Sequence, residues 1–161
     1  MQEYLADLHI HSRFSRATSK KLCIPLLTAW ARLKGITVLG TGDFTHPKWR
    51  EEMRESLQYE EESGLYSLKD PESVSAMLPE LPVDKASATR SASRRAKEVE
   101  DATGIAQPSV RFMLQGEISS IYKRGDKVRK IHNLVFMPDM ETAEKFSLRL
   151  AEIGNLNADG R

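Results

Sequence analysis

The sequence predicts an α/β protein built on a parallel strand–helix–strand unit. Residues 4–11 alternate between apolar and polar side chains, as in a strand with one buried face. Residues 25–35 place apolar side chains at helical spacing, and residues 36–41 form a short β-rich run. A helix between two such strands favours parallel pairing of the strands.

The ends of the first helix are indicated by Pro25, which suits a first helical turn, and by Gly35, which suits a C-terminal cap. We expect a polar, basic loop over residues 12–22, before this helix. After the second strand, residues 48–62 are predicted to form a charged, solvated helix. Residues 64–83 contain a glycine and several prolines and are expected to be an irregular insertion.

The second half of the chain predicts a surface helix, a hairpin and a final helix. Residues 85–102 are rich in Ala, Arg, Ser, Lys and Glu, which favours the surface helix. Residues 110–123 and 128–137 are strand-like runs on either side of a charged turn. Asp139 can cap the final helix, and residues 155–161 are a polar tail.

The composition of the 161 residues, 40% apolar and 29% charged, fits one soluble domain. A net charge of +1 gives no global electrostatic case for nucleic-acid binding. No apolar run approaches the roughly 20 residues that span a bilayer. With one cysteine and no signal-peptide pattern at the N-terminus, we expect a cytoplasmic protein without internal disulfides.

All four histidines lie in short stretches typical of a metal site: His9 and His11, then His46, then His132. Histidine is the commonest metal ligand, because a neutral imidazole offers a lone pair. On a strand, side chains two positions apart point the same way, so His9 and His11 can converge on one ion. Taken alone, the pair fits a half-exposed polar strand face equally well.

Other candidate ligands strengthen the prediction of a metal site. Asp43 and His46 follow the second predicted strand, and functional groups cluster where parallel strands end. Glu117 follows a glycine in a later strand, and carboxylates bridge metal ions well. Each residue has an ordinary alternative: a turn residue for Asp43, a helix start for His46, a surface position for Glu117 and a hydrogen-bonded core residue for His132. Together they favour a metal-dependent hydrolytic site, with Asp43 and Glu117 as the catalytic carboxylates.

These stretches resemble the PHP (polymerase and histidinol phosphatase) superfamily of metal-dependent phosphoesterases. The resemblance starts at residues 7–12 and continues through residues 42–46, 116–117 and His132. Within that superfamily the chain is most similar to the endonuclease Q family. The similar runs are residues 7–19, 40–49, 116–122, 128–135, 153–156 and 159–161.

The resemblance implies a distorted (β/α) barrel, incomplete in residues 1–161, that holds two or three divalent ions (Zn, Mn or Mg). It implies an endonuclease that cuts DNA 5′ to deaminated bases or abasic sites. Relatives often carry a second histidine where this chain has Asn133. They also take later histidine and aspartate ligands and a C-terminal zinc-binding region that this chain lacks, so we expect part of a longer protein. The implied metal ligands are His9, His11, Glu117 and His132, with Asp43 and His46 as a ligand and its neighbour or second ligand.

Two basic clusters are candidate DNA contacts near the predicted site: Arg13, Arg16 and Lys20 after the first strand, and Lys123, Arg124 and Lys127 in the hairpin. Charge runs are usually solvated faces, and we prefer that interpretation for the helix over residues 85–102. For the loop at the strand end, phosphate contact is favoured at least equally. The alternatives to an endonuclease are a small-molecule phosphoesterase and a non-catalytic scaffold that binds metal or DNA.

Overall fold

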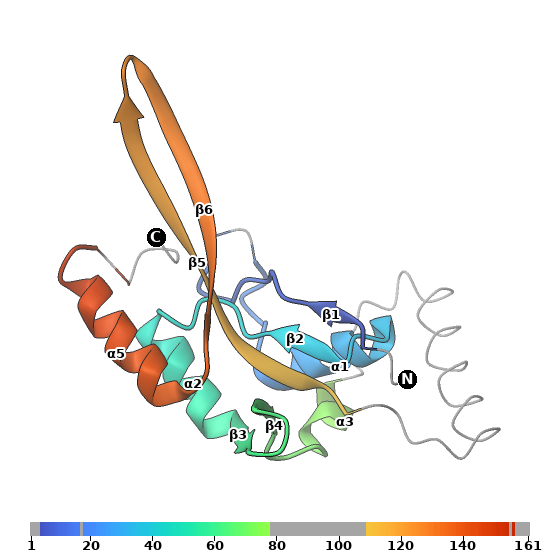
Figure 1. The fold of residues 1–161 in the computed structure, drawn as a ribbon. Coiled ribbons are helices and arrows are strands. Elements are labelled where there is room, and N and C mark those ends of the chain that lie inside the picture. Colours follow the sequence, from blue (N-terminus) through green and yellow to red (C-terminus); the bar gives the residue numbers. More distant parts are fainter. Residues whose placement is uncertain (1–3, 17, 78–108, 155, 157–161) are drawn as a thin grey trace.

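The structure, a computed structural model, describes residues 4–16, 18–77, 109–154 and 156, and its backbone is organised by a six-stranded sheet (Figure 1). Five strands follow one another in the order β1–β2–β5–β4–β3, and β6 pairs with β5. The strands are β1 (Ala6–Asp7), β2 (Val38–Gly40), β3 (Leu57–Glu60), β4 (Leu65–Leu68), β5 (Arg111–Arg124) and β6 (Lys127–Met137).

The parallel unit that the sequence predicts is confirmed. Helix α1 (Ile24–Lys34) joins β1 to β2, has Pro25 in its first turn and ends at Gly35, whose φ is 73°. Strands β1 and β2 are parallel, and β5 is parallel to β2 on its other side. Strand β1 is shorter than predicted: only Ala6–Asp7 is paired, so the chain leaves the sheet before it reaches the first histidine.

The predicted helix over residues 48–62 is confirmed only in part. Helix α2 spans Pro47–Ser56, and the chain then enters β3, which pairs antiparallel with β4. The alternation of Leu57, Gln58, Tyr59 and Glu60 suits this pairing, and Leu57 is buried. The expectation of an irregular insertion was therefore wrong for β4 and for the short helix α3 (Ser73–Met77). The predicted helix over residues 85–102 lies outside the described residues, as does the tail apart from Leu156.

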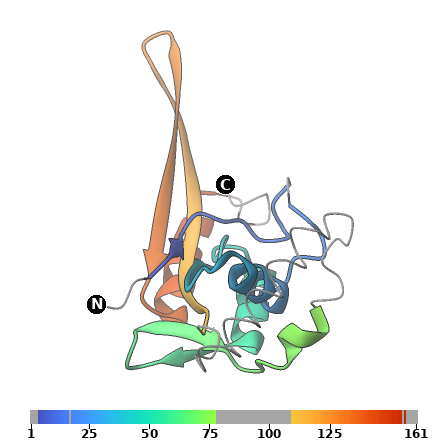
Figure 2. The same cartoon turned by 90° about the vertical axis from the view of Figure 1, so that its right-hand side faces the viewer.

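The predicted hairpin and final helix are confirmed. Strands β5 and β6 pair antiparallel, and residues 120–134 are exposed because the hairpin projects from the body of the molecule (Figures 1 and 2). Helix α5 (Met140–Ala151) follows, and the Asp139 side chain accepts a hydrogen bond of 2.7 Å from the backbone N–H of Thr142. That bond satisfies one of the unpaired donors of the first helical turn.

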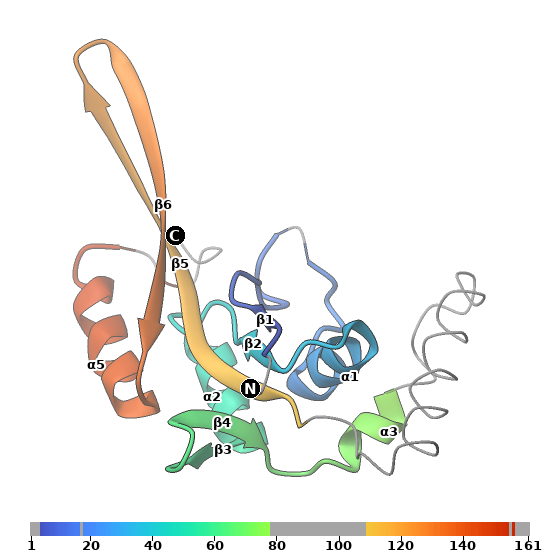
Figure 3. The ribbon, with the colours of Figure 1, turned by 45° about the vertical axis from the view of Figure 1, so that its right-hand side comes forward.

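The core lies between the sheet and its helices and includes the fully buried side chains of Ile24, Phe44, Trp49, Phe112 and Leu114. Helices α2 and α5 lie side by side (Figure 3) and are joined by a 3.1 Å hydrogen bond from the Arg50 guanidinium to Ser147 Oγ. The described strands form an open sheet, so the predicted barrel stays a prediction. In the part of the chain that the structure describes, no helix has the length and apolar character to cross a bilayer.

Gly42 gives a test of how the strand ends are packed. Its φ is +69°, and a Cβ there would lie 2.9 Å from the carbonyl carbon of His11 and 2.9 Å from the carbonyl oxygen of Ile10. We expect Gly42→Ala to lower the free energy of unfolding by clearly more than the roughly 1–2 kcal/mol that a left-handed backbone costs a non-glycine residue. Urea unfolding monitored by circular dichroism measures this.

Gly35→Ala is the matched control, because Gly35 has a φ of +73° but a Cβ there would meet nothing within 4 Å. Gly35→Ala therefore has only the energetic cost of a left-handed backbone at a non-glycine residue. Equal destabilisation by the two substitutions would contradict the close packing described at Gly42.

Candidate metal centre

The candidate metal centre lies at the edge of the sheet where β1, β2 and β5 point in the same direction. The register sets Asp7 opposite Leu39, and Leu39 opposite Phe112. Residues that follow these positions on each strand therefore reach the same edge, as in other parallel sheets. This edge collects side chains from three segments that are far apart in the sequence.

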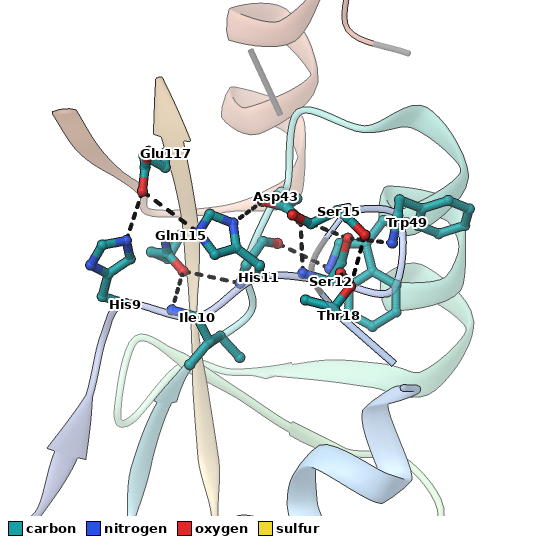
Figure 4. Close-up of polar contacts among 12 residues, drawn as sticks. His9, Ile10, His11, Ser12, Ser15, Thr18, Asp43, Trp49, Gln115 and Glu117 are labelled. Carbon is teal, nitrogen blue, oxygen red and sulfur yellow. Dashed lines mark hydrogen bonds and ion pairs between the residues drawn. The ribbon is translucent and has the colours of Figure 1, made fainter. Parts of the chain in front are cut away.

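His9 and His11 lie beyond the end of β1, yet both rings turn toward Glu117 (Figure 4). Their ring centroids are 5.6 Å apart. His9 Nε2 donates a 2.7 Å hydrogen bond to Glu117 Oε2, and His11 Nε2 lies 3.6 Å from the same oxygen. One ligand atom from each of the three residues lies within 4.8 Å of the other two. The structure thus brings three of the predicted ligands together.

His132 joins the same carboxylate from β6. Its Nδ1 contacts Glu117 Oε1 and lies 3.2 Å from Ser119 Oγ. The neighbouring Asn133 turns elsewhere, since its amide donates to the carbonyl of Ile118 and to the hydroxyl of Ser120, at 3.4 Å each. Of the two adjacent side chains, His132 is therefore the one that faces the site.

Glu117 is held as an anion by the rings around it. The hydrogen bond from His132, and after it the bond from His9, keep the pKa of Glu117 below its usual value, although partial burial opposes this. Three imidazoles around one carboxylate provide negative charge and nitrogen lone pairs in one place. A cation would replace the proton between each ring nitrogen and the carboxylate, as metal binding to histidine generally does.

Asp43 orients His11. Its Oδ1 accepts a 3.0 Å hydrogen bond from His11 Nδ1, and its Oδ2 accepts bonds of 2.7 Å from both the backbone N–H and the hydroxyl of Ser12 (Figure 4). A carboxylate on one ring nitrogen fixes the tautomer and leaves the lone pair of the other nitrogen free for a metal. The contacts favour this orienting role, and the predicted roles of Asp43 as ligand and catalytic group stay predictions.

The backbone at Asp43 is unusual, which is consistent with a functional position. Its φ is 37°, and it follows Gly42, whose φ is also positive. Two successive residues of this kind turn the chain sharply after β2. Trp49 fixes that turn, because its indole N–H lies 3.1 Å from the carbonyl oxygen of Thr41 and 3.0 Å from that of Gly42.

His46 stands apart from the cluster. It precedes α2 and is buried, with its ring stacked on Phe14 at a centroid distance of 4.1 Å. Burial lowers the pKa of His46, an effect that nearby Asp43 opposes. Its Nδ1 has no hydrogen-bond partner among the described residues. A neutral ring with an unpaired nitrogen keeps the ligand prediction open, but the group formed by His9, His11 and Glu117 does not include it.

The predicted DNA-contacting residues fall into two regions. Lys123, Arg124 and Lys127 are exposed near the tip of the β5–β6 hairpin. In the loop after His11, the Arg13 guanidinium pairs with Glu52 at 2.5 Å, and Lys20 Nζ donates to the carbonyl of Arg13 at 3.1 Å. Arg16 is exposed in that loop.

Two residues that support the site were not predicted. Ser12 is fully buried and holds Asp43, as described above. Gln115 is fully buried in β5, two residues before Glu117. A polar residue inside the apolar run Phe-Met-Leu-Gln was the available signal. Gly116 leaves room for the core, because a Cβ there would lie 3.1 Å from the Phe44 ring.

The side chains fit a divalent metal. Ligand atoms about 2.0–2.1 Å from zinc lie about 3.4 Å apart in a tetrahedral site, which the observed spacing reaches with small side-chain movements. Imidazole with carboxylate suits zinc, manganese or iron, whereas magnesium prefers oxygen ligands. The described residues thus define an α/β protein whose strand ends carry a histidine and carboxylate cluster that could hold a metal ion.

Comparison with known proteins identifies a structural relative. The fold is similar to two crystal structures of endonuclease Q, each with a TM-score of 0.59 over 97% of this chain. One is a complex with a 27-mer duplex substrate with an abasic lesion at the active site, at 21% identity. The other is the lesion-specific endonuclease from Pyrococcus furiosus, at 20% identity. The chain spans 28% of the length of either protein.

Sequence comparison adds one relative. A stretch of 49 residues is 49% identical to an uncharacterized protein of Methanocaldococcus jannaschii. The stretch makes up 30% of this chain and 6% of that protein. No protein-family model matches the sequence. The comparisons therefore establish the fold that this chain shares with part of endonuclease Q.

Replacing the central carboxylate tests the metal centre. We expect Glu117→Gln to weaken Mn²⁺ and Zn²⁺ binding by at least about ten-fold, because the amide lacks the charge that attracts the cation. Isothermal titration calorimetry measures the change. Glu144→Gln is the control, because it makes the same chemical change at a surface residue that pairs with Arg54, away from the metal centre. Equal affinities for Glu117→Gln and the unaltered protein would contradict the assignment.

Proposed function

We propose that this chain carries the metal-binding part of a DNA endonuclease of the endonuclease Q type, which cuts 5′ to deaminated bases or abasic sites. The observation that carries the proposal is the convergence of His9, His11 and Glu117 at the strand ends, with His132 on the same carboxylate. We include in the proposal membership of the PHP superfamily and a fold of the distorted (β/α) barrel type.

The chemistry of the cluster supports hydrolysis of a phosphodiester. A divalent cation there would acidify a water molecule and offset charge on the phosphoryl oxygens. Glu117 and the lone pairs of His9 and His11 would hold the cation. Asp43 would keep the His11 ring in its binding tautomer. We propose two or three Zn, Mn or Mg ions in a complete site, with His46 as a further ligand.

Lesioned DNA as the substrate is supported by the shared fold. The similar structure of endonuclease Q holds a duplex with an abasic lesion at its active site. A damaged or missing base costs less to move out of the stack, which gives such enzymes part of their selectivity.

The β5–β6 hairpin is the proposed DNA-binding arm. Residues 123–130 contain five basic residues and one acidic residue, whereas the whole chain has a net charge of only +1. The same two strands carry Glu117 and His132 at the base of the hairpin, so the arm is continuous with the metal centre. A two-stranded β-ribbon fits the major groove of DNA. Arg13, Arg16 and Lys20 would add phosphate contacts from the loop after His11.

Cleavage of defined duplexes tests the proposed function. We expect the protein to cut end-labelled duplexes 5′ to a uracil, a hypoxanthine or an abasic site when Mn²⁺ or Zn²⁺ is present, and to leave undamaged duplex intact. His9→Ala combined with His11→Ala removes two ligands and should abolish both metal binding and cleavage. Gel electrophoresis gives the position of the cut.

A simple phosphate monoester separates the alternatives. Hydrolysis of the monoester alone would favour a small-molecule phosphoesterase. Absence of bound metal by elemental analysis, together with no hydrolysis of either substrate, would favour a non-catalytic scaffold. Either result would contradict the proposed function.

Salt dependence tests the hairpin. Each phosphate contact on B-DNA contributes about 0.9 to the slope of log affinity against log salt concentration. Lys123→Gln with Arg124→Gln should reduce that slope by up to about 1.8, measured by fluorescence anisotropy in metal-free buffer. Lys145→Gln with Arg149→Gln on α5 removes the same charge elsewhere and is the control. Equal effects of the two pairs would show that net charge alone matters.

A further inference from the structure

Gln115 is a buried polar residue beneath the metal centre. Its side chain is fully buried in β5, and its Oε1 accepts a 3.1 Å hydrogen bond from the backbone N–H of Gly42. The same oxygen accepts a longer contact of 3.5 Å from the backbone N–H of Ile10 (Figure 4). A buried amide in an apolar core is costly unless it is hydrogen-bonded, and these two partners satisfy its oxygen.

The two partners lie at the same level of the sheet as Gln115. Asp7, Leu39 and Phe112 are aligned across the three parallel strands. Ile10, Gly42 and Gln115 each lie three residues further along their own segments. The regular pairing of β1 and β2 ends at Asp7 and Leu39, before this level. The Gln115 oxygen therefore accepts two backbone N–H groups where the chains have left the β1–β2 ladder.

These contacts connect all the segments that carry candidate ligands. Ile10 lies between His9 and His11, and Gly42 directly precedes Asp43. Glu117 is two residues from Gln115 on β5, so both side chains lie on the same face of that strand. One side-chain oxygen on the strand of the central carboxylate thus bonds to both the β1 end and the β2 end. The β2 end is also held to β5 by the bond from the backbone N–H of Thr41 to the carbonyl of Met113.

Two glycines, Gly40 and Gly42, leave room for these contacts of Gln115. A Cβ on Gly40 would lie 3.0 Å from Gln115 Oε1, and a Cβ on Gly42 would lie 2.9 Å from the backbone of the histidine segment. The other amide atom, Gln115 Nε2, has no hydrogen-bond partner among the described residues. The side-chain hydrogen bonds of Gln115 to the two strand ends therefore both run through the acceptor oxygen, whereas its backbone N–H separately donates to the Thr41 hydroxyl at 3.0 Å.

We infer that Gln115 is a positioning residue for the metal centre: its Oε1 holds the ends of β1 and β2 at the spacing at which His9, His11 and Glu117 can share one cation. The inference about the cation rests on the proposed function, whereas the inference about the strand ends does not.

Gln115→Met tests the role, because methionine has a similar length and no strong acceptor. We expect Mn²⁺ and Zn²⁺ affinity, measured by calorimetry, to fall at least about ten-fold, the range seen when a residue that orients a ligand is lost. The d–d absorption spectrum of bound Co²⁺ should also change, since it reports the coordination geometry. Gln115→Glu keeps an acceptor oxygen and should restore most of the affinity and the original spectrum.

Hydrogen exchange in metal-free buffer gives a readout that needs no metal. Mass spectrometry should show faster amide exchange in residues 8–13 and 40–44 of Gln115→Met than in the unaltered protein. Leu114→Ala is the control, because Leu114 is also fully buried in β5 but its side chain points to the opposite face. It should lower the melting temperature and leave metal affinity intact.

Unchanged exchange and metal affinity in Gln115→Met would overturn the inference, and so would equal changes in Gln115→Met and Leu114→Ala. If Gln115→Met does not fold, Gly40→Ala displaces the same oxygen, and unchanged exchange in residues 8–13 of that variant would overturn it as well. If the unaltered protein binds no metal, the proposed function fails, and the exchange comparison still decides the role of Gln115.

Discussion

The parallel register of β1, β2 and β5 is the constraint on which the candidate metal centre depends. Side chains along a strand alternate between faces, so a slip of one residue moves every side chain to the other face. On β5 such a slip would place Gly116 where Glu117 meets the histidine rings. The register is set by buried apolar side chains below the site, including Leu39 and Phe112, and by the close approach at Gly42. Stability of the core and geometry of the site are therefore determined by the same contacts.

The candidate metal centre has two layers of side chains with different physical roles. The outer layer consists of the partly buried Glu117 and the more exposed rings of His9, His11 and His132, which supply charge and lone pairs. The layer beneath consists of buried groups, Asp43 with Ser12 and Gln115, which fix one ring and two backbone segments. Hydrogen bonds are stronger in the buried layer because water is excluded there. Buried groups that are already in position lower the cost of gathering ligands around a cation, which is how a metal site gains affinity.

The elements that a local sequence pattern indicates, including the β1–α1–β2 unit and the β5–β6 hairpin, could be predicted from the sequence. The β3–β4 pair and the side-chain contacts between distant segments could not. Helix α1 has a proline at its start and a glycine at its end, and α5 has the Asp139 cap. Strand β3 was missed because no glycine or proline separates α2 from Leu57, and β4 was missed because the glycine and prolines of residues 64–83 indicated an irregular insertion. At the site, residue chemistry predicted His9, His11, His132 and Glu117, which the structure brings together, and also His46, which lies apart from them. Gln115 was missed because its role appears only when three distant segments are aligned, and the ion pair of Arg13 with Glu52 likewise joins residues far apart in the chain.

Anomalous diffraction at the metal absorption edge, from crystals of the protein grown with Zn²⁺ or Mn²⁺, tests the central claim most directly. A shared cation at the strand ends predicts an anomalous peak about 2.0–2.2 Å from a ring nitrogen of His9, a ring nitrogen of His11 and a carboxylate oxygen of Glu117. A map with no peak between these three side chains, or with the rings turned to separate places, would contradict the claim.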